Sequence, residues 1–172
     1  GLEKPKVDRL TLTPKIIAGM AAACREVAAE PDLVGALDRQ WVQPNGMLVG
    51  HMRVPLGVVA MIFESRPNVT VDASILCLKS GNAVILRGGS EAFESNTFLM
   101  GLVREALATA GLPEDAAQPV PTRDREAVAA LCRLDAYVDG VIPPGGGGLV
   151  KAVASPATIP GPQHDQGGGP HS

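Results

Sequence analysis

The chain has 172 residues, 15 basic and 18 acidic side chains, and a formal net charge of −3. That length suits one domain with its own hydrophobic core, and the dispersed basic residues argue against a nucleic-acid-binding surface. No apolar run approaches the ~20 residues that cross a bilayer, and the N-terminal GLEKPKVDR has no apolar signal segment. We therefore expect a cytoplasmic protein without a membrane partner.

Hydrophobic residues make up 45% of the chain, but aromatic residues only 3%. The core must then be built from Ala, Val, Leu and Ile, which suits strands covered on both faces by helices. The three cysteines, Cys24, Cys77 and Cys132, have no close partner in the sequence, and each lies in an apolar helical pattern. We expect all three to be reduced core residues.

The first predicted element is an amphipathic helix over residues 13–29. Thr13 is expected to cap it, with Pro14 at the first helical position. A second helix is predicted over residues 33–42, ending at the turn Gln43-Pro44-Asn45-Gly46. Residues 47–54 alternate between apolar and polar side chains well enough to predict an extended segment.

From residue 57 onward, strand patterns alternate with helical patterns. Strands are predicted over residues 57–63, 83–86, 118–121 and 137–142, and helices over residues 69–79, 92–110, 125–133 and 149–154. Strands joined through helices in this way form parallel sheets. The sequence therefore predicts an α/β fold with a Rossmann-like, doubly wound parallel sheet and helices on both faces.

A polar turn follows the first of these strands. Ser65, Arg66 and Asn68 lie here, between the strand and the next helix. Ligands of open parallel sheets bind at the carboxyl ends of the strands, so these side chains are candidates to face a substrate. The alternative is purely structural: Pro67 begins the helix, and Ser65 or Asn68 caps it.

A second candidate site follows the next strand and consists of Arg87, Gly88, Gly89, Ser90 and Glu91. The adenosine ribose of a bound dinucleotide lies at this position in many such sheets. A cation here favours a 2′-phosphate, so we expect NADP rather than NAD. The alternative is a strand-to-helix turn capped by Ser90, with Arg87 in solvent.

The third candidate is the glycine run Gly145, Gly146, Gly147 and Gly148, which lies between a predicted strand and a predicted helix. Such a loop could let a pyrophosphate approach the helix, although its spacing matches no phosphate-loop motif. A metal site has little support, because His51, His164 and His171 are dispersed. A serine hydrolase also has little support, because no GxSxG motif occurs.

The stretch RVPLGVVAMIFESRPNVTVDASILCLKSGNAVILRGGSE (residues 53–91) resembles the γ-glutamyl phosphate reductase family, whose members are also called glutamate-5-semialdehyde dehydrogenases. The segments DRLTL, WVQPNG and VIPPGGGGLVK are similar to that family too, so the resemblance covers about residues 7 to 160. The runs ESRPNVTVDA and GNAVILRGG distinguish this family from ordinary aldehyde dehydrogenases, whose fold it shares. They argue against a general aldehyde dehydrogenase.

The resemblance implies an oxidoreductase of proline biosynthesis that reduces L-glutamyl 5-phosphate with NADPH to L-glutamate 5-semialdehyde and releases phosphate. It implies that residues 87–91 bind the adenosine end of NADP, that residues 145–148 lie near the pyrophosphate, and that Ser65, Arg66 and Asn68 face the reacting centre. It also implies that the complete enzyme has a catalytic cysteine in a separate catalytic domain and forms a homo-oligomer. None of the three cysteines here matches the family's nucleophile.

The sequence departs from the family pattern at two places. Pro144 stands where the family usually has arginine, which removes a cation near the phosphates. From Gly161 onward the sequence no longer resembles the family, which suggests a frame shift or a truncated gene. We therefore expect a partial NADP-binding domain over residues 1–160, a disordered tail over residues 161–172, and no activity from the chain alone. The alternative is a non-catalytic nucleotide-binding or assembly module.

Overall fold

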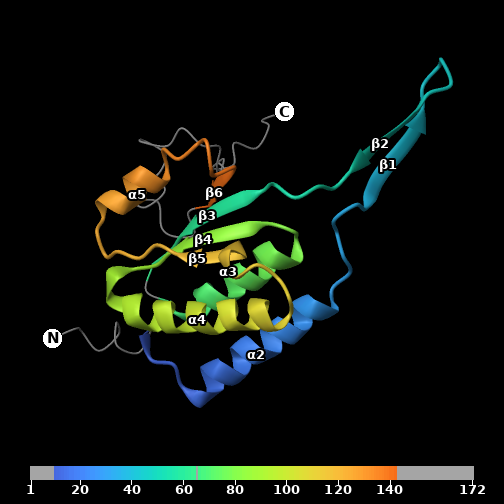
Figure 1. Ribbon diagram of the computed structural model, residues 1–172. Coiled ribbons are helices and arrows are strands. Elements are labelled where there is room, and N and C mark those ends of the chain that lie inside the picture. The colour runs from blue at the N-terminus through green and yellow to red at the C-terminus, as the bar shows by residue number, and fades with distance from the viewer. Residues whose placement is uncertain (1–9, 65, 143–172) are drawn as a thin grey trace, which may run out of the picture.

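The computed structural model describes residues 10–64 and 66–142. Its centre is a parallel sheet of four strands in the order β5-β4-β3-β6 (Figure 1). The strands are β3 (Val58–Ile62), β4 (Ala83–Arg87), β5 (Ala117–Pro119) and β6 (Gly140–Ile142). The chain therefore builds outward from β3 through β4 to β5 and then returns to place β6 on the other side of β3. This change of direction makes the sheet doubly wound.

Helices cover both faces of the sheet. On one face, α3 (Asn68–Lys79) connects β3 to β4, and α4 (Phe93–Thr109) connects β4 to β5. The helix α2 (Pro14–Ala29) lies against α3 on the outside, and the short helix α5 (Glu126–Leu131) covers the opposite face (Figure 1). Two 3-10 turns, η1 (Ser90–Ala92) and η2 (Glu114–Ala116), flank α4. The predicted fold class is confirmed.

The hydrophobic core consists of two clusters separated by the sheet. Alternate residues of β3 point to opposite faces, so Val59 packs with residues of α3 and α4, whereas Ala60 and Ile62 pack with residues of α5 and β6. Val59 and Ile62 are each only 2% exposed. The near-continuous apolar sequence of β3 follows from this burial on both sides.

Most of the predicted elements lie where the sequence placed them. Thr13 caps α2, and its hydroxyl accepts a hydrogen bond from the Ile16 backbone amide at 3.3 Å. The strand expected over residues 118–121 is short and becomes β5, and the helix over residues 125–133 is shorter than expected. The helix predicted over residues 149–154 lies outside the described residues.

The helix predicted over residues 33–42 is wrong. Residues 37–42 form the strand β1 (Leu37–Val42), which pairs antiparallel with β2 (Leu48–Met52) across the expected turn at residues 43–46. Pro31 and Gly35 leave only about two helical turns before that turn, and so short a helix is marginal in water. The hairpin satisfies the same amides through its ladder, and Trp41 stacks edge-on against His51 across it at 5.3 Å.

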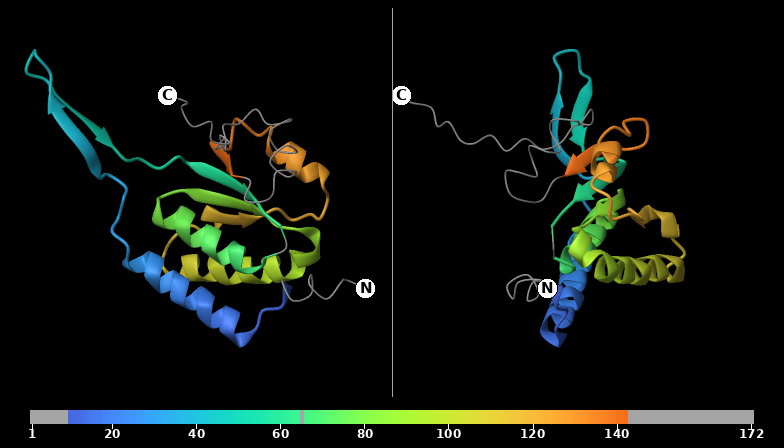
Figure 2. Two further views of the ribbon diagram at one scale, coloured as in Figure 1. Left: turned by 180° about the vertical axis from the view of Figure 1, so that it is seen from behind. Right: turned by 90° about the vertical axis from the view of Figure 1, so that its left-hand side faces the viewer.

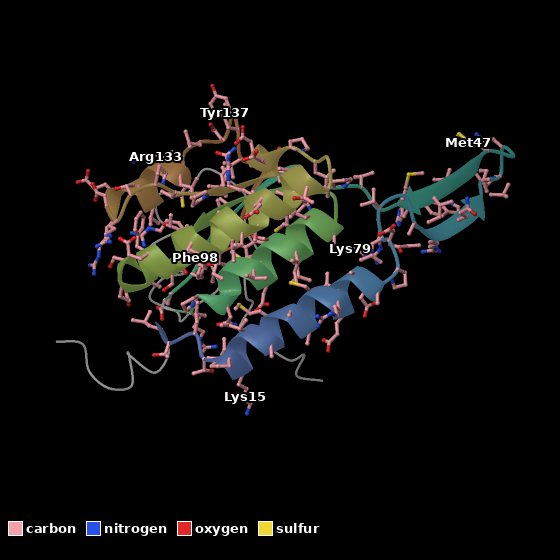
Figure 3. All side chains as sticks on the ribbon, turned by 60° about the horizontal axis from the view of Figure 1, so that its bottom comes forward. Lys15, Met47, Lys79, Phe98, Arg133 and Tyr137 are labelled. Atoms are coloured by element: carbon pink, nitrogen blue, oxygen red, sulfur yellow. The ribbon has the colours of Figure 1, made fainter. Side chains whose placement is uncertain are left out.

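This hairpin projects away from the body of the molecule, as the views from three sides agree (Figures 1 and 2). Met47 lies at its tip, 56% exposed (Figure 3). Val42 and Leu48 are also largely exposed, so the β1–β2 ribbon buries little apolar surface against the rest of the chain.

Candidate functional site

A pocket of about 470 Å³ opens at the carboxyl ends of β3 and β4. Its volume lies within the range of small-molecule sites, and its place in the sheet is where open parallel sheets bind ligands. Three segments line it: the end of β3, the turn after β4, and α5 with the residue before it. The lining residues are Ile62, Phe63, Glu64, Arg87, Gly89, Ser90, Glu91, Arg125, Val128 and Ala129.

The walls of this pocket differ in chemical character. Ile62 at the end of β3 and Phe63 directly after it give one apolar wall, and Val128 and Ala129 from α5 give another. The charged lining side chains are the carboxylates of Glu64 and Glu91 and the guanidinium groups of Arg87 and Arg125. A flat apolar ring between the walls, with polar and phosphorylated groups at the charged rim, is the kind of ligand that this arrangement suits.

Arg87 ends β4 and is 8% exposed. Its Nη2 donates hydrogen bonds to the backbone carbonyls of Arg123 at 3.1 Å and Asp124 at 3.2 Å, and its Nη1 donates to the carbonyl of Gly88. Its Nε is buried and has no hydrogen-bond partner among the described residues. The predicted cation therefore lies at the pocket, but most of its donors bind the backbone of the segment that leads into α5.

Gly88 does not line the pocket, and its importance is in packing. A Cβ at this position would come within 2.1 Å of Asn96 Nδ2 and 3.0 Å of the Phe63 ring. Asn96 itself is buried in α4, where its Oδ1 accepts a hydrogen bond from the Thr70 hydroxyl of α3 at 3.1 Å. The missing side chain lets the start of α4 lie close to the end of β4, as glycines after the strands of nucleotide-binding folds do.

Gly89, Ser90 and Glu91 all line the pocket. The Ser90 hydroxyl donates to Glu91 Oε2 at 3.3 Å. Ser90 does not cap the turn that it begins: the cap position of η1 is Gly89, with no side-chain hydrogen bond. A hydroxyl that donates to a carboxylate thus lies in the lining of the pocket.

The residues of the first candidate turn lie in different places. Ser65 is outside the described residues, as are Gly145 to Gly148. Arg66 is exposed, while Asn68 donates from Nδ2 to Asp72 at 3.2 Å and faces a second hollow of about 350 Å³ between α2 and α3. Asn68 provides no cap either, since the cap position of α3 is Pro67 with no side-chain bond.

The candidate residues predicted from the sequence did not include Glu64 or the α5 wall. Glu64 belongs to the same polar turn as Ser65, so a position directly at the strand end was the available signal. Arg125, Val128 and Ala129 reach the pocket because β5 pairs with β4, which brings the segment after β5 beside the end of β4. No short-range pattern in the sequence carries that strand order.

The cysteines are outside the pocket. Cys77 and Cys132 are buried and Cys24 is partly buried, and all three are free thiols. Burial raises the pKa of the Cys77 thiol, and burial raises the pKa of Cys132 against the opposing charge of Arg133. Buried thiols of this kind stay protonated near neutral pH and are poor nucleophiles. The expectation of reduced core cysteines is confirmed for Cys77 and Cys132.

Over residues 10–64 and 66–142, no group of three or more His, Cys, Asp or Glu side chains is placed to hold a metal ion. None of the described helices combines the length and apolar character that a membrane span requires.

The aldehyde dehydrogenase family matches residues 9–160 of the chain. The chain therefore belongs to the aldehyde dehydrogenase family. Within this superfamily it is similar to curated γ-glutamyl phosphate reductases. It is 64% identical over 167 residues to that of Solidesulfovibrio magneticus and 59% identical over 167 residues to that of Nitratidesulfovibrio vulgaris. Each alignment covers 97% of this chain and 40% of the relative, so the chain spans about two fifths of their length.

Solved structures of the same fold are also similar to this chain. The crystal structure of γ-glutamyl phosphate reductase from Thermotoga maritima matches 94% of this chain and 39% of its own, with 43% identity and a TM-score of 0.89. An engineered glycolyl-CoA reductase with bound NADP+ matches 93% of this chain and 42% of its own, with a TM-score of 0.64. At 22% identity, that second likeness concerns the fold alone.

Proposed function

We propose that this chain provides the NADP-binding part of a γ-glutamyl phosphate reductase, which reduces L-glutamyl 5-phosphate to L-glutamate 5-semialdehyde with NADPH and releases phosphate in proline biosynthesis. The observation that carries this proposal is the pocket at the carboxyl ends of β3 and β4, lined by the loop that resembles the family's adenosine-binding segment. The high identity to curated relatives of that name supports the reaction.

The residues of the pocket fit the adenosine end of NADPH. Val128 and Ala129 offer an apolar wall to an adenine ring, and the hydrogen-bonded pair Ser90 and Glu91 provides polar groups for ribose hydroxyls. Arg87 is a buried cation whose hydrogen bonds all go to backbone carbonyls rather than carboxylates, so its charge favours an anion nearby. When bound, the cofactor supplies the hydride. Residues 145–148 remain our proposal for the pyrophosphate loop.

The described residues of the pocket would bind and orient the cofactor, and they include no cysteine thiol. Cys77 and Cys132 are buried with raised pKa values, and none of the three cysteines lines the pocket. We propose that Ser65 and Arg66, at the end of β3, face the small-molecule substrate in the complete enzyme. The hydrogen bond from Asn68 to Asp72 makes Asn68 the weaker candidate of that turn.

We further propose a cytoplasmic location and a homo-oligomeric complete enzyme, as the resemblance implies. A non-catalytic nucleotide-binding module is the second candidate function. The absence of a cysteine from the described pocket lining favours it, since this pocket could bind the dinucleotide without supplying a thiol. The two proposals agree on the cofactor site and differ on turnover.

The first test is a fluorescence titration of the purified chain with NADPH and NADH, using a variant that fills the pocket. Ala129→Leu should weaken the binding of both dinucleotides by about tenfold, because the added side chain occupies the apolar wall, whereas Ala130→Leu, one position along and exposed, should not. Equal binding by both variants would place the cofactor elsewhere. Turnover of glutamate 5-semialdehyde with phosphate and NADP would contradict the expectation that this chain alone is inactive.

A further inference from the structure

Two arginines, Arg87 and Arg125, line the pocket, and a third, Arg123, lies two residues before Arg125 in the chain; their guanidinium groups differ in what they contact. Arg123 forms an ion pair with Glu94 and stacks on the Phe93 ring, with its Cζ 4.9 Å from the ring centroid. This side chain is therefore held against the first turn of α4. Arg87 is held by the carbonyls of Gly88, Arg123 and Asp124.

Arg125 differs from both. It follows the two residues that Arg87 holds, lines the pocket and is exposed. Its guanidinium has no hydrogen bond or ion pair with any of the described residues. An arginine without a partner presents a planar fork of donors that matches a phosphate group.

The hydrogen bonds of Arg87 bear directly on where Arg125 lies. Both hydrogen bonds from Nη2 go to carbonyls of the segment immediately before Arg125, at 3.1 and 3.2 Å. Arg87 itself is only 8% exposed. This buried side chain therefore joins the end of β4 to the start of α5. The segment that carries Arg125 is fixed at the pocket by the residue that the sequence pattern had assigned to the phosphate itself.

We propose that Arg125 is the specificity-determining residue for the 2′-phosphate of NADPH, and that Arg87 is a positioning residue that holds the backbone before it. This inference rests on the proposed cofactor site. Glu91 also lines the pocket, and its carboxylate would repel a phosphate. The Arg125 guanidinium is therefore what would shift the specificity of the pocket toward the phosphorylated ribose.

The test measures the dissociation constants of the full chain for NADPH, NADH and adenosine 2′,5′-bisphosphate, with circular dichroism as the check on folding. Arg125→Gln should weaken NADPH and the bisphosphate about tenfold, the ratio that ~1.4 kcal/mol produces, and leave NADH unchanged. Arg133→Gln removes the same charge from an exposed site beside α5 but outside the pocket (Figure 3), and should change nothing.

The role of Arg87 is tested by a double-mutant cycle. Arg87→Lys keeps the positive charge but cannot hold both carbonyls in the same way, so it should reduce the preference for NADPH over NADH. In the Arg125→Gln background the same change should leave the remaining preference as it is, because Arg87 acts through Arg125. Additive losses would show that Arg87 contacts the phosphate directly and would overturn this part.

The outcomes separate this inference from the proposed function. An unchanged NADPH affinity in Arg125→Gln, with wild-type binding intact, overturns the inference and leaves the cofactor site standing. Equal weakening of NADPH and NADH also overturns it, since Arg125 would then shape the pocket rather than recognise the phosphate. Failure of the folded wild-type chain to bind either dinucleotide overturns the proposed function, and the inference with it.

Discussion

The Asp139 carboxylate lies where a side chain on Gly57 would begin. A Cβ on Gly57 would come within 2.1 Å of Asp139 Oδ2, and the same oxygen accepts a hydrogen bond from the Val58 amide at 2.7 Å. The Asp139 amide in turn donates to the Val58 carbonyl at 2.8 Å. These contacts join the start of β3 to the residue before β6, on the side of the sheet where the winding direction changes.

Gly57→Ala is therefore expected to destabilise the chain strongly. Gly57 has a φ of +118°, a conformation that side chains strain to adopt, and its Cβ would displace Asp139. We expect a loss of at least about 2 kcal/mol in the free energy of unfolding, measured by urea denaturation. Gly19→Ala is the control: with no atom near its Cβ and a place inside α2, it should stabilise by up to about 1 kcal/mol. Similar values for the two variants would contradict this account of Gly57.

The second prediction concerns the core between the sheet and α5. Ile62→Ala should cost about 2–5 kcal/mol, because the side chain is 2% exposed and its removal leaves a cavity. Val42→Ala on the projecting hairpin, where the side chain is 66% exposed, should cost well under about 1 kcal/mol. Thermal and urea unfolding of both variants provide the measurement. A large loss for Val42→Ala would mean that the hairpin packs against something in solution.

The third prediction concerns the hydrogen bond from Thr70 to Asn96. Thr70→Val preserves shape but leaves Asn96 Oδ1 without its donor in a buried position, which should cost about 1–3 kcal/mol. Thr109→Val removes a hydroxyl that bonds only the Glu105 carbonyl at the exposed end of α4, and should change stability by less than about 0.5 kcal/mol. Equal unfolding midpoints for the two variants would argue that the pairing of α3 with α4 does not depend on this bond.

The fourth prediction is a dependence of stability on alkaline pH. Burial raises the pKa of Cys77 above its unfolded value, so the native state keeps this proton at a pH where the unfolded state releases it. The contribution is fully present below the unfolded thiol pKa of about 8.5 and decreases as pH rises from there toward the folded pKa. Between about pH 8 and about pH 10, the urea midpoint of Cys77→Ala should therefore fall less than that of the parent chain. Parallel declines would show that other groups control the alkaline limit.

The sheet could be predicted because its elements carry local signals. A window of a dozen residues is enough to recognise each of three elements: the apolar run of β3, the helical pattern after Pro67 and the short strand β4 with its branched side chains. The segment 37–42 could not be assigned in this way, since its strand conformation depends on pairing with β2. The local sequence pattern was therefore enough to predict the strands that are buried on both faces. It was not enough for residues 37–42, whose strand conformation depends on pairing with another strand.

The site divides along the same line. Gly89, Ser90 and Glu91 follow β4 directly, so their position at its carboxyl end is readable from the sequence. The hydrogen-bond partners of Arg87 depend on the path of the chain after β5, and so does the position of Arg125 in the pocket lining. A residue type at a strand end thus predicts a place in the pocket, while the hydrogen bonds made there belong to the tertiary structure.

The projecting β1–β2 hairpin has a consequence for how the chain opens. Its ladder is local, its side chains are largely exposed, and a two-stranded ribbon is only marginally stable by itself. Its amides can therefore exchange with solvent deuterium through a small opening that leaves the sheet intact, long before those of β3 and β4. The chain thus consists of a slowly exchanging sheet and a rapidly exchanging arm. The free energy of opening measured for one does not predict that of the other.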